Sequence, residues 1–103
     1  HWASHVDSVY NLIRGCNPAP GAWTTFAGKK IQIFDAKKHL FRTFGAVKGK
    51  IGEISEIGST SFRITTQGGQ IEVLKAKGED TKKISGSELA AALGLTVGTL
   101  LGV

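Results

Sequence analysis

Hydrophobic residues near the start of the chain recur at the spacing of a helix. Successive members lie at i, i+3, i+4 and i+7, which places all of them on one helical face. The stripe consists of Val6, Val9, Tyr10 and Ile13. Ser4 can cap the N-terminus, and Gly15 suits the left-handed position just past the last turn. The pattern therefore predicts an amphipathic helix over residues 4–15.

From residue 22 onward hydrophobic and polar residues alternate, and a period of two is typical of strands. Glycine-containing pairs separate the alternating runs at Ala27-Gly28, Gly58-Ser59 and Gly68-Gly69, and such pairs favour hairpin turns. We predict strands over residues 22–26, 31–36, 50–57, 61–66 and 70–76, with a bulge in the third. Residues 39–44 form either a further strand or an ordered loop.

A second helix is expected close to the C-terminus. Ser85 followed three residues later by Glu88 is a capping box, and Gly94 can end the helix in the left-handed conformation. We predict a helix over residues 87–94 and a final short strand over residues 96–102. Five or six short strands joined by glycine turns favour a small barrel, because a barrel leaves few long edges unpaired.

The formal net charge is +5, and the excess positive charge is concentrated in one basic segment, residues 29–50. Asp35 is its single acidic residue before Glu53, and its cations are Lys29, Lys30, Lys37, Lys38, Arg42, Lys48 and Lys50. Such a segment either contacts the phosphates of a nucleic acid or is a solvated hairpin whose lysines protect a strand edge. The interleaved phenylalanines are expected to pack inside the barrel. They are Phe34, Phe41 and Phe44.

The composition excludes several classes of protein. A chain of 103 residues with 41% hydrophobic and 20% charged residues fits one globular domain. No apolar run approaches the roughly 20 residues of a membrane span. Cys16 is the only cysteine, which excludes an internal disulfide and indicates a reducing compartment. His1, His5 and His39 lack metal-ligand spacing. Because the chain begins at His1 and has no methionine, we interpret it as a domain of a longer protein.

The most specific motif is IRGCNPAPGAW at residues 13–23, which joins the helical pattern to the first predicted strand. This motif, followed by TTFAGKKIQIFDA at residues 24–36 and ISGSELAAALGL at residues 84–95, resembles the C-terminal domain of the 10-formyltetrahydrofolate-dependent formyltransferases. That family includes methionyl-tRNA formyltransferase and the hydrolase domain of 10-formyltetrahydrofolate dehydrogenase. The matching connector residues are Arg14, Asn17, Pro18, Pro20, Gly21 and Trp23.

The resemblance implies an OB-like, open Greek-key barrel over residues 22–103, preceded by a linker helix and a Pro-Gly connector at residues 1–21. In the family, a Rossmann-like catalytic domain comes first and carries the folate site and the Asn, His and Asp catalytic residues. None of these has a counterpart here. The chain alone is therefore expected to bind no cofactor or metal and to be inactive. Its parent would be a cytoplasmic formyltransferase whose co-substrate is 10-formyltetrahydrofolate, with the catalytic domain of the same chain as partner.

The formyl acceptor is less closely specified by the resemblance. The basic segment and the family together favour methionyl-tRNA, which the domain would position beside the catalytic domain. Ala19 stands where many tRNA-specific members have tryptophan, Gly15 matches the dehydrogenase type, and Ile51 replaces a common proline. Water and an amino sugar therefore stay open as acceptors. With either of these, the domain would have a structural role without nucleic-acid binding.

Trp23 opens the first predicted strand directly after Pro-Gly-Ala. Its indole ring could stack on a base or on a pterin, or it could pack at the barrel end or at the seam between two domains. Its position at the start of the strand favours the packing interpretation.

Overall fold

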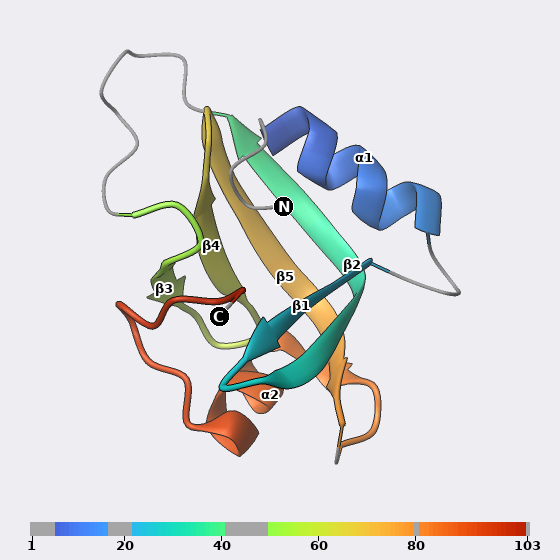
Figure 1. Ribbon diagram of the computed structural model, residues 1–103, viewed down its shortest axis with the longest axis vertical. Helices are drawn as coiled ribbons and strands as arrows, with labels where there is room; N and C mark the ends of the chain where they lie inside the picture. Colours follow the sequence, from blue (N-terminus) through green and yellow to red (C-terminus); the bar gives the residue numbers. More distant parts are fainter. Residues whose placement is uncertain (1–5, 17–21, 41–49, 80, 103) are drawn as a thin grey trace.

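The computed structural model describes residues 6–16, 22–40, 50–79 and 81–102 (Figure 1). Two helices and six strands make up this part of the chain. In chain order they are α1 (Val6–Cys16), β1 (Ala22–Phe26), β2 (Lys29–Leu40), β3 (Ile54–Ile57), β4 (Phe62–Thr66), β5 (Gly69–Gly78), β6 (Ile84–Ser85) and α2 (Gly86–Leu93). The fold is mainly β with one helix at each end, as the sequence predicts.

All strand pairs are antiparallel, and the sheet has the order β1-β2-β5-β4-β3, with β6 paired to β5. The strands β3, β4 and β5 follow one another as neighbours, while β2 precedes them in the chain and pairs with β5. A Greek key has three strands that are neighbours both in the chain and in the sheet, and a fourth strand, joined to them by a long connection, that pairs at the other end of the three. Here the three are β3, β4 and β5, and β2 is the fourth. The predicted Greek-key arrangement is therefore confirmed.

The C-terminal segment, drawn in red in Figure 1, connects the two outer strands of the sheet. On the β3 side, the Gly98 amide donates to the Ile54 carbonyl at 2.8 Å, and the Leu101 amide donates to Gly52 at 2.9 Å. On the β1 side, the Gly102 amide donates to the Thr25 carbonyl at 2.7 Å. These bonds satisfy backbone groups that an open sheet would leave exposed on both edges.

The predicted final strand over residues 96–102 is nevertheless wrong. Within the described residues this segment forms one isolated bridge, between Glu53 and Leu100. The reason is local, because Gly98 has φ +96° and Gly102 has φ +86°, and neither angle occurs in an extended strand. The third predicted strand is shortened in the same way, since Gly52 has φ +87° and β3 begins only at Ile54.

The longest strand, β2, has 12 residues and pairs with β1 on one edge and with β5 on the other. Its register with β5 shifts on both sides of Asp35, which marks two adjacent bulges. Bulges bend a strand and increase its twist, so β2 can follow the curled sheet over its whole length. Residues 37 and 38, expected beyond the strand, belong to it, and so do His39 and Leu40. Residues 41–44 lie outside the described part.

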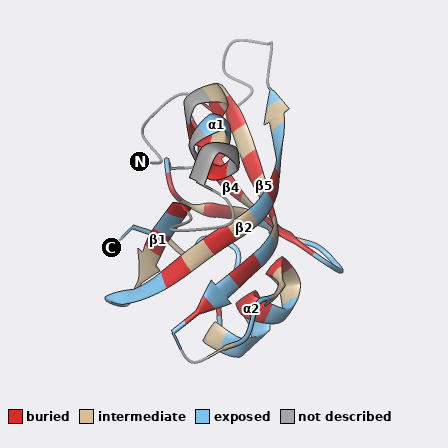
Figure 2. Cartoon of the chain, turned by 90° about the vertical axis from the view of Figure 1, so that its right-hand side faces the viewer, coloured by how far each residue is buried: buried red, intermediate tan, exposed pale blue. Residues whose placement is uncertain are grey.

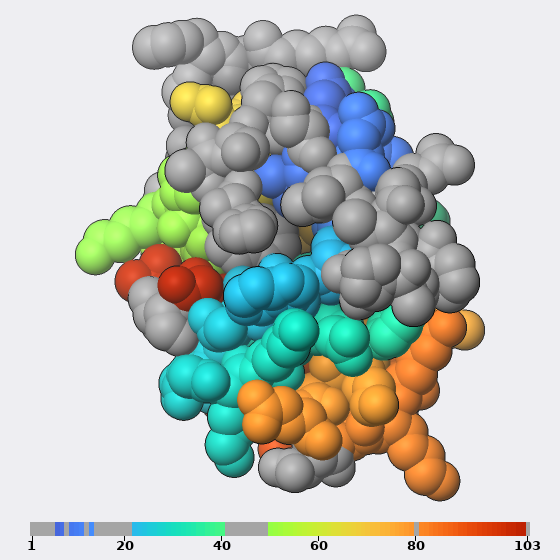
Figure 3. All heavy atoms as spheres, turned by 45° about the vertical axis from the view of Figure 1, so that its right-hand side comes forward, coloured from blue at the N-terminus to red at the C-terminus, as the bar shows by residue number. Residues whose placement is uncertain are grey.

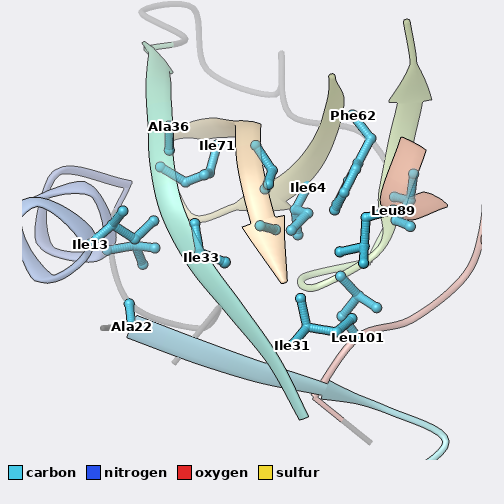
Figure 4. Packing of buried hydrophobic residues seen from close by; sticks show 14 of the residues in the cluster. Ile13, Ala22, Ile31, Ile33, Ala36, Phe62, Ile64, Ile71, Leu89 and Leu101 are labelled. Carbon is cyan, nitrogen blue, oxygen red and sulfur yellow. The ribbon is translucent and has the colours of Figure 1, made fainter. Parts of the chain in front are cut away.

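The hydrophobic core fills the inside of the curled sheet (Figure 4). The stripe on α1 is confirmed, because its three aliphatic residues are buried and Tyr10 packs against them partly buried. Figure 4 places Ile13 and Ala22 toward one end of the core and Leu89 and Leu101 toward the other. The sheet contributes Ile31, Ile33, Ile54, Phe62, Ile64, Ile71 and Val73 between them. The two helices thus cover opposite ends of the core (Figure 2).

The helix boundaries agree with the sequence at α2 and differ at α1. Ser85 Oγ accepts from the Glu88 amide at 3.2 Å, the Glu88 carboxylate accepts from the Ser85 amide at 3.4 Å, and Gly94 ends the helix at φ +70°. The capping box is therefore confirmed. Gly15, expected just past the end of α1, lies inside it, because the helix continues to Cys16. Within the described residues, no helix has the length and hydrophobicity needed to cross a membrane.

The β1–β2 hairpin turn gives the first testable prediction. Ala27 has φ +53° and Gly28 has φ +80°, so both residues are left-handed, as a type I′ turn requires. Alanine pays a steric cost of about 1 kcal/mol in this conformation, whereas asparagine adopts it readily. Ala27→Asn should therefore raise the free energy of unfolding by about 0.5–1 kcal/mol in a urea titration. Gly28→Ala is the control with the opposite sign and should lower the free energy of unfolding. Equal effects of the two substitutions, or effects of reversed sign, would contradict the turn type.

A second prediction concerns the start of α2. A Cβ atom added at Gly86 would lie 2.1 Å from the Val73 carbonyl oxygen, because the first turn of α2 rests directly on β5. Gly86→Ala should therefore cost about 3 kcal/mol, at the upper end of the usual range for overpacking. Gly58→Ala is the matched control, since its added Cβ would meet Ser61 at an ordinary 3.5 Å. Similar thermal unfolding midpoints for the two variants would show that the start of α2 does not pack this closely against β5.

Candidate functional site

The outward face of β1, β2 and β5 carries a row of side chains that crosses all three strands. Trp23 on β1 is the register partner of Gln32 on β2, and Gln32 is the register partner of Lys77 on β5. Each of the three alternates with buried neighbours, for example Ile31 and Ile33 on β2, so each points away from the core. The row therefore lies on the solvent side of the sheet.

Two aromatic rings on this face are each covered by a lysine. Lys30 Nζ lies 4.9 Å from the centre of the Trp23 ring, and Lys83 Nζ lies 4.7 Å from the centre of the Phe34 ring. Both distances are within the range of cation–π interactions. We call this surface the aromatic–lysine face and define it by Trp23, Lys30, Gln32, Phe34, Lys77 and Lys83. Figure 3 shows the cyan and teal surface of β1 and β2 meeting the orange surface of β5 and the segment after it.

A small open hollow lies within the aromatic–lysine face. It has a volume of about 100 Å³ and is lined by Lys30, Gln32, Lys77, Gly78 and Glu79. The Glu79 carboxylate accepts a hydrogen bond of 2.7 Å from the Lys30 backbone amide. Pockets for small-molecule cofactors usually have about 300–1,000 Å³. The hollow is therefore suited to a polar group of a larger ligand and not to a complete folate.

The basic segment predicted from the sequence does not form one cluster. Lys29 and Lys30 lie at the start of β2, and Lys37 and Lys38 lie about 23 Å farther along the same strand at 3.3 Å per residue. Lys50 lies beside β3, where its amide donates to Glu53. Arg42 and Lys48 are outside the described residues. Of the predicted cations that the structure describes, Lys30 alone belongs to the aromatic–lysine face.

The two lysines at the far end of β2 point to opposite sides of the sheet. Lys38 turns toward α1, where its Nζ lies 2.8 Å from the Asp7 carboxylate and 5.3 Å from the centre of the Tyr10 ring. Lys37 is the register partner of Glu72, which lies on the outward face of β5. Nearby carboxylates therefore reduce the positive potential of this half of the strand.

The packing predicted for Phe34 is wrong, and of the two packing positions predicted for Trp23 the structure excludes the barrel end and leaves the seam between domains untested. The Trp23 side chain is not inside the barrel end, since the residue is 46% exposed. Phe34 is half-buried on the outward face and is not part of the core. The physical reason is strand alternation, because Ile31, Ile33 and Ala22 occupy the inward positions next to them. Phe41 and Phe44 are outside the described residues.

The proposed interdomain connector lies mostly outside the described part of the chain. Asn17, Pro18, Pro20 and Gly21 are not described, and Arg14 belongs to the last turn of α1. Trp23 is the connector residue whose side chain can be placed, and its exposed ring could pack against a second domain. The role of the connector stays a prediction.

Three members of the face were missed by sequence reasoning, namely Gln32, Lys77 and Lys83. The alternation of Lys77 with Ala76 and Gly78, which are buried on β5, could have predicted that Lys77 points outward. The sequence gives no register between β5 and β2, however, and Lys77 lies 45 positions after Gln32. Lys83 precedes β6 and reaches Phe34 only because β6 pairs with β5.

A polar network occupies the other half of the outward face. Glu72 accepts from Ser61 Oγ at 2.5 Å through one carboxylate oxygen, and His39 Nε2 lies 2.7 Å from the other oxygen. The Ser61 hydrogen bond, followed by that of His39, holds the pKa of Glu72 below its usual value of 4.5. Since serine and histidine both bond to the carboxylate and not to each other, histidine is not placed to activate the serine. The network therefore joins β2, β4 and β5 structurally.

This network predicts how stability depends on pH. The folded-state pKa of Glu72 is depressed, so its ionised carboxylate stabilises the fold above the unfolded-state pKa, and this contribution is lost as the pH falls through the folded value. Glu72→Gln should therefore lower stability at pH 7 and flatten the stability profile as the pH falls below the usual glutamate pKa of 4.5. Glu56→Gln is the control, because the Glu56 side chain is 65% exposed and 3.7 Å from Arg63. Parallel acid-unfolding profiles for wild type and Glu72→Gln would contradict this assignment.

The chain matches the family described as "Formyl transferase, C-terminal domain" over residues 1–94. It is 32% identical over 102 residues to the methionyl-tRNA formyltransferase of Syntrophomonas wolfei, covering 99% of this chain and 31% of that protein. It is 38% identical over 85 residues to the methionyl-tRNA formyltransferase of Carboxydothermus hydrogenoformans, covering 82% of this chain and 26% of that protein. The chain thus spans less than a third of these relatives.

The fold is also similar to part of a larger solved structure. HypX from Aquifex aeolicus, solved in complex with tetrahydrofolic acid, superposes with a TM-score of 0.68 at 23% identity, covering 91% of this chain and 16% of that chain. At this identity the similarity establishes the fold alone. The family match and the relatives confirm the resemblance noted in the sequence: the chain belongs to the formyl transferase C-terminal domain family.

Proposed function

We propose that this chain is a non-catalytic accessory domain that binds tRNA and positions it as the formyl acceptor. Its curated relatives are named methionyl-tRNA formyltransferases, and the chain spans less than a third of their length. The remaining part of such a protein would contain the catalytic domain and use 10-formyltetrahydrofolate. The cytoplasm, where tRNA is aminoacylated, is the compartment that this function requires.

The observation that carries the proposal is the aromatic–lysine face. Its three lysines, Lys30, Lys77 and Lys83, come from separate segments and converge on one side of the sheet. Lysines that neutralise phosphates release condensed counterions, and this release supplies much of the affinity for a polyanion. The formal net charge of +5 favours the same partner over long range. A solvated face without a partner would not require two aromatic rings beneath its cations.

A binding domain of this kind would contribute to catalysis through orientation. Binding energy from parts of a substrate that do not react can hold the reacting group in position, which lowers the entropic part of the barrier. The hollow of about 100 Å³ is smaller than usual cofactor pockets, so we expect the folate to bind outside these residues. Glu72 separates the hydroxyl of Ser61 from the imidazole of His39, which supports a role without acyl transfer.

The proposal predicts a salt-dependent affinity for tRNA that depends on the aromatic–lysine face. The triple variant Lys30→Gln, Lys77→Gln and Lys83→Gln should bind tRNA more weakly in a fluorescence-anisotropy titration at two salt concentrations. Its log–log salt slope should be smaller in magnitude by about 2–3, because each lost phosphate contact contributes about 0.7–0.9.

The matched control is the triple variant Lys37→Gln, Lys38→Gln and Lys50→Gln. It removes as many positive charges, three, from the net charge of +5, and all three positions belong to the basic segment predicted from the sequence. We expect it to retain most of the affinity. An equal loss in both variants would contradict the assignment to this face. No binding by the wild type at low salt would contradict the function and favour a structural role in a hydrolase, a dehydrogenase or an amino-sugar formyltransferase.

A further inference from the structure

The two rings of the aromatic–lysine face lie close enough to act together. Trp23 is the register partner of Gln32, and Phe34 follows Gln32 by two positions on the same outward side of β2. Diagonal neighbours of this kind on adjacent strands are about 7–8 Å apart. That separation is comparable to the spacing of consecutive bases in an extended single strand. The two rings therefore form a pair of adjacent platforms.

The chemistry around the rings suits a base on top of each. Trp23 is 46% exposed, so a ligand can reach its indole ring from the solvent. Lys30 and Lys83 lie over the two rings, so each ring has a cation close by that can contact the phosphate of a stacked nucleotide. Stacking on aromatic side chains combined with lysine contacts to the backbone is the usual mode of binding single strands.

We propose that the aromatic–lysine face binds two consecutive unpaired nucleotides of RNA, one base on Trp23 and the other on Phe34. This inference rests on the proposed tRNA-binding function and specifies how the same face recognises its ligand. The ammonium groups of Lys30 and Lys83 move from the rings to the phosphates when the bases stack. Paired bases cannot bind in this way, because in a helix their faces are covered by their neighbours.

The hollow beside the rings supports a nucleotide ligand over a simple anion. The Glu79 carboxylate lines it together with the Gln32 amide, and a carboxylate there repels a phosphate. Both groups can accept a hydrogen bond from a ribose 2′-hydroxyl or from an exocyclic amino group. In this arrangement the lysines around the hollow bind the phosphates, and the sugar or the base edge lies inside the hollow.

The test follows the fluorescence of Trp23 in the full chain. Trp2→Phe makes Trp23 the sole tryptophan. A single-stranded RNA hexamer should quench this fluorescence, whereas a blunt RNA duplex of the same length should not. Trp23→Leu and Phe34→Leu should each weaken hexamer binding about 10-fold to 100-fold, since base stacking contributes strongly at each position. Neither substitution should change the affinity for the duplex.

Trp23→Tyr is the matched control, because it keeps an aromatic ring and should retain most of the hexamer affinity. Circular dichroism and the thermal midpoint show whether each variant is folded. Unchanged hexamer binding by Trp23→Leu, or equal quenching by the duplex, would overturn the stacking mode. The tRNA-binding function would survive this result if the triple lysine variant still lost tRNA affinity. Absence of salt-dependent binding to any RNA would overturn both.

Discussion

The pairing of β2 with strands on both of its edges determines most of this structure. Because β1 and β5 fix the strand from two sides, Ile31 and Ile33 can only point into the core. The residues that alternate with them, Lys30, Gln32 and Phe34, must then point outward. The same hydrophobic alternation that stabilises the sheet therefore sets which side chains can meet a ligand. A shift of register by one residue would exchange the two sets.

The bulges around Asp35 divide the outward side of β2 into two different surfaces. Before the bulges, Lys30 and Lys83 lie over two aromatic rings, and Lys77 of β5 lies beside Gln32 on the same face. After them, Glu72 bonds to Ser61 and His39 on this side, while Lys38 points to the opposite side of the sheet and pairs with Asp7 on α1. Positive charge that is continuous in the sequence is thus separated in space. Charge that is dispersed in the sequence is brought together by the sheet.

The helices and strands could be predicted because each depends on a local sequence pattern. The candidate site could not be predicted in full, because it depends on contacts between residues far apart in the sequence. The helical stripe of α1, the Ala27-Gly28 turn and the capping box at Ser85 each depend on residues within one short segment. The register between β2 and β5 depends on pairs such as Gln32 and Lys77, for which the sequence carries no signal. The C-terminal segment was predicted as a strand, but two glycines with positive φ interrupt it. It therefore bonds to β3 and to β1 through a few backbone hydrogen bonds.

Chemical-shift mapping of the ¹⁵N-labelled chain with tRNA tests most directly whether RNA binds through the aromatic–lysine face. The largest changes should occur at the backbone amides of Gln32 and Lys77 and at the indole of Trp23, which form one row across three strands. Changes concentrated instead at Lys37 and Glu72, or on α1, would show that the RNA lies on another surface and would contradict this assignment.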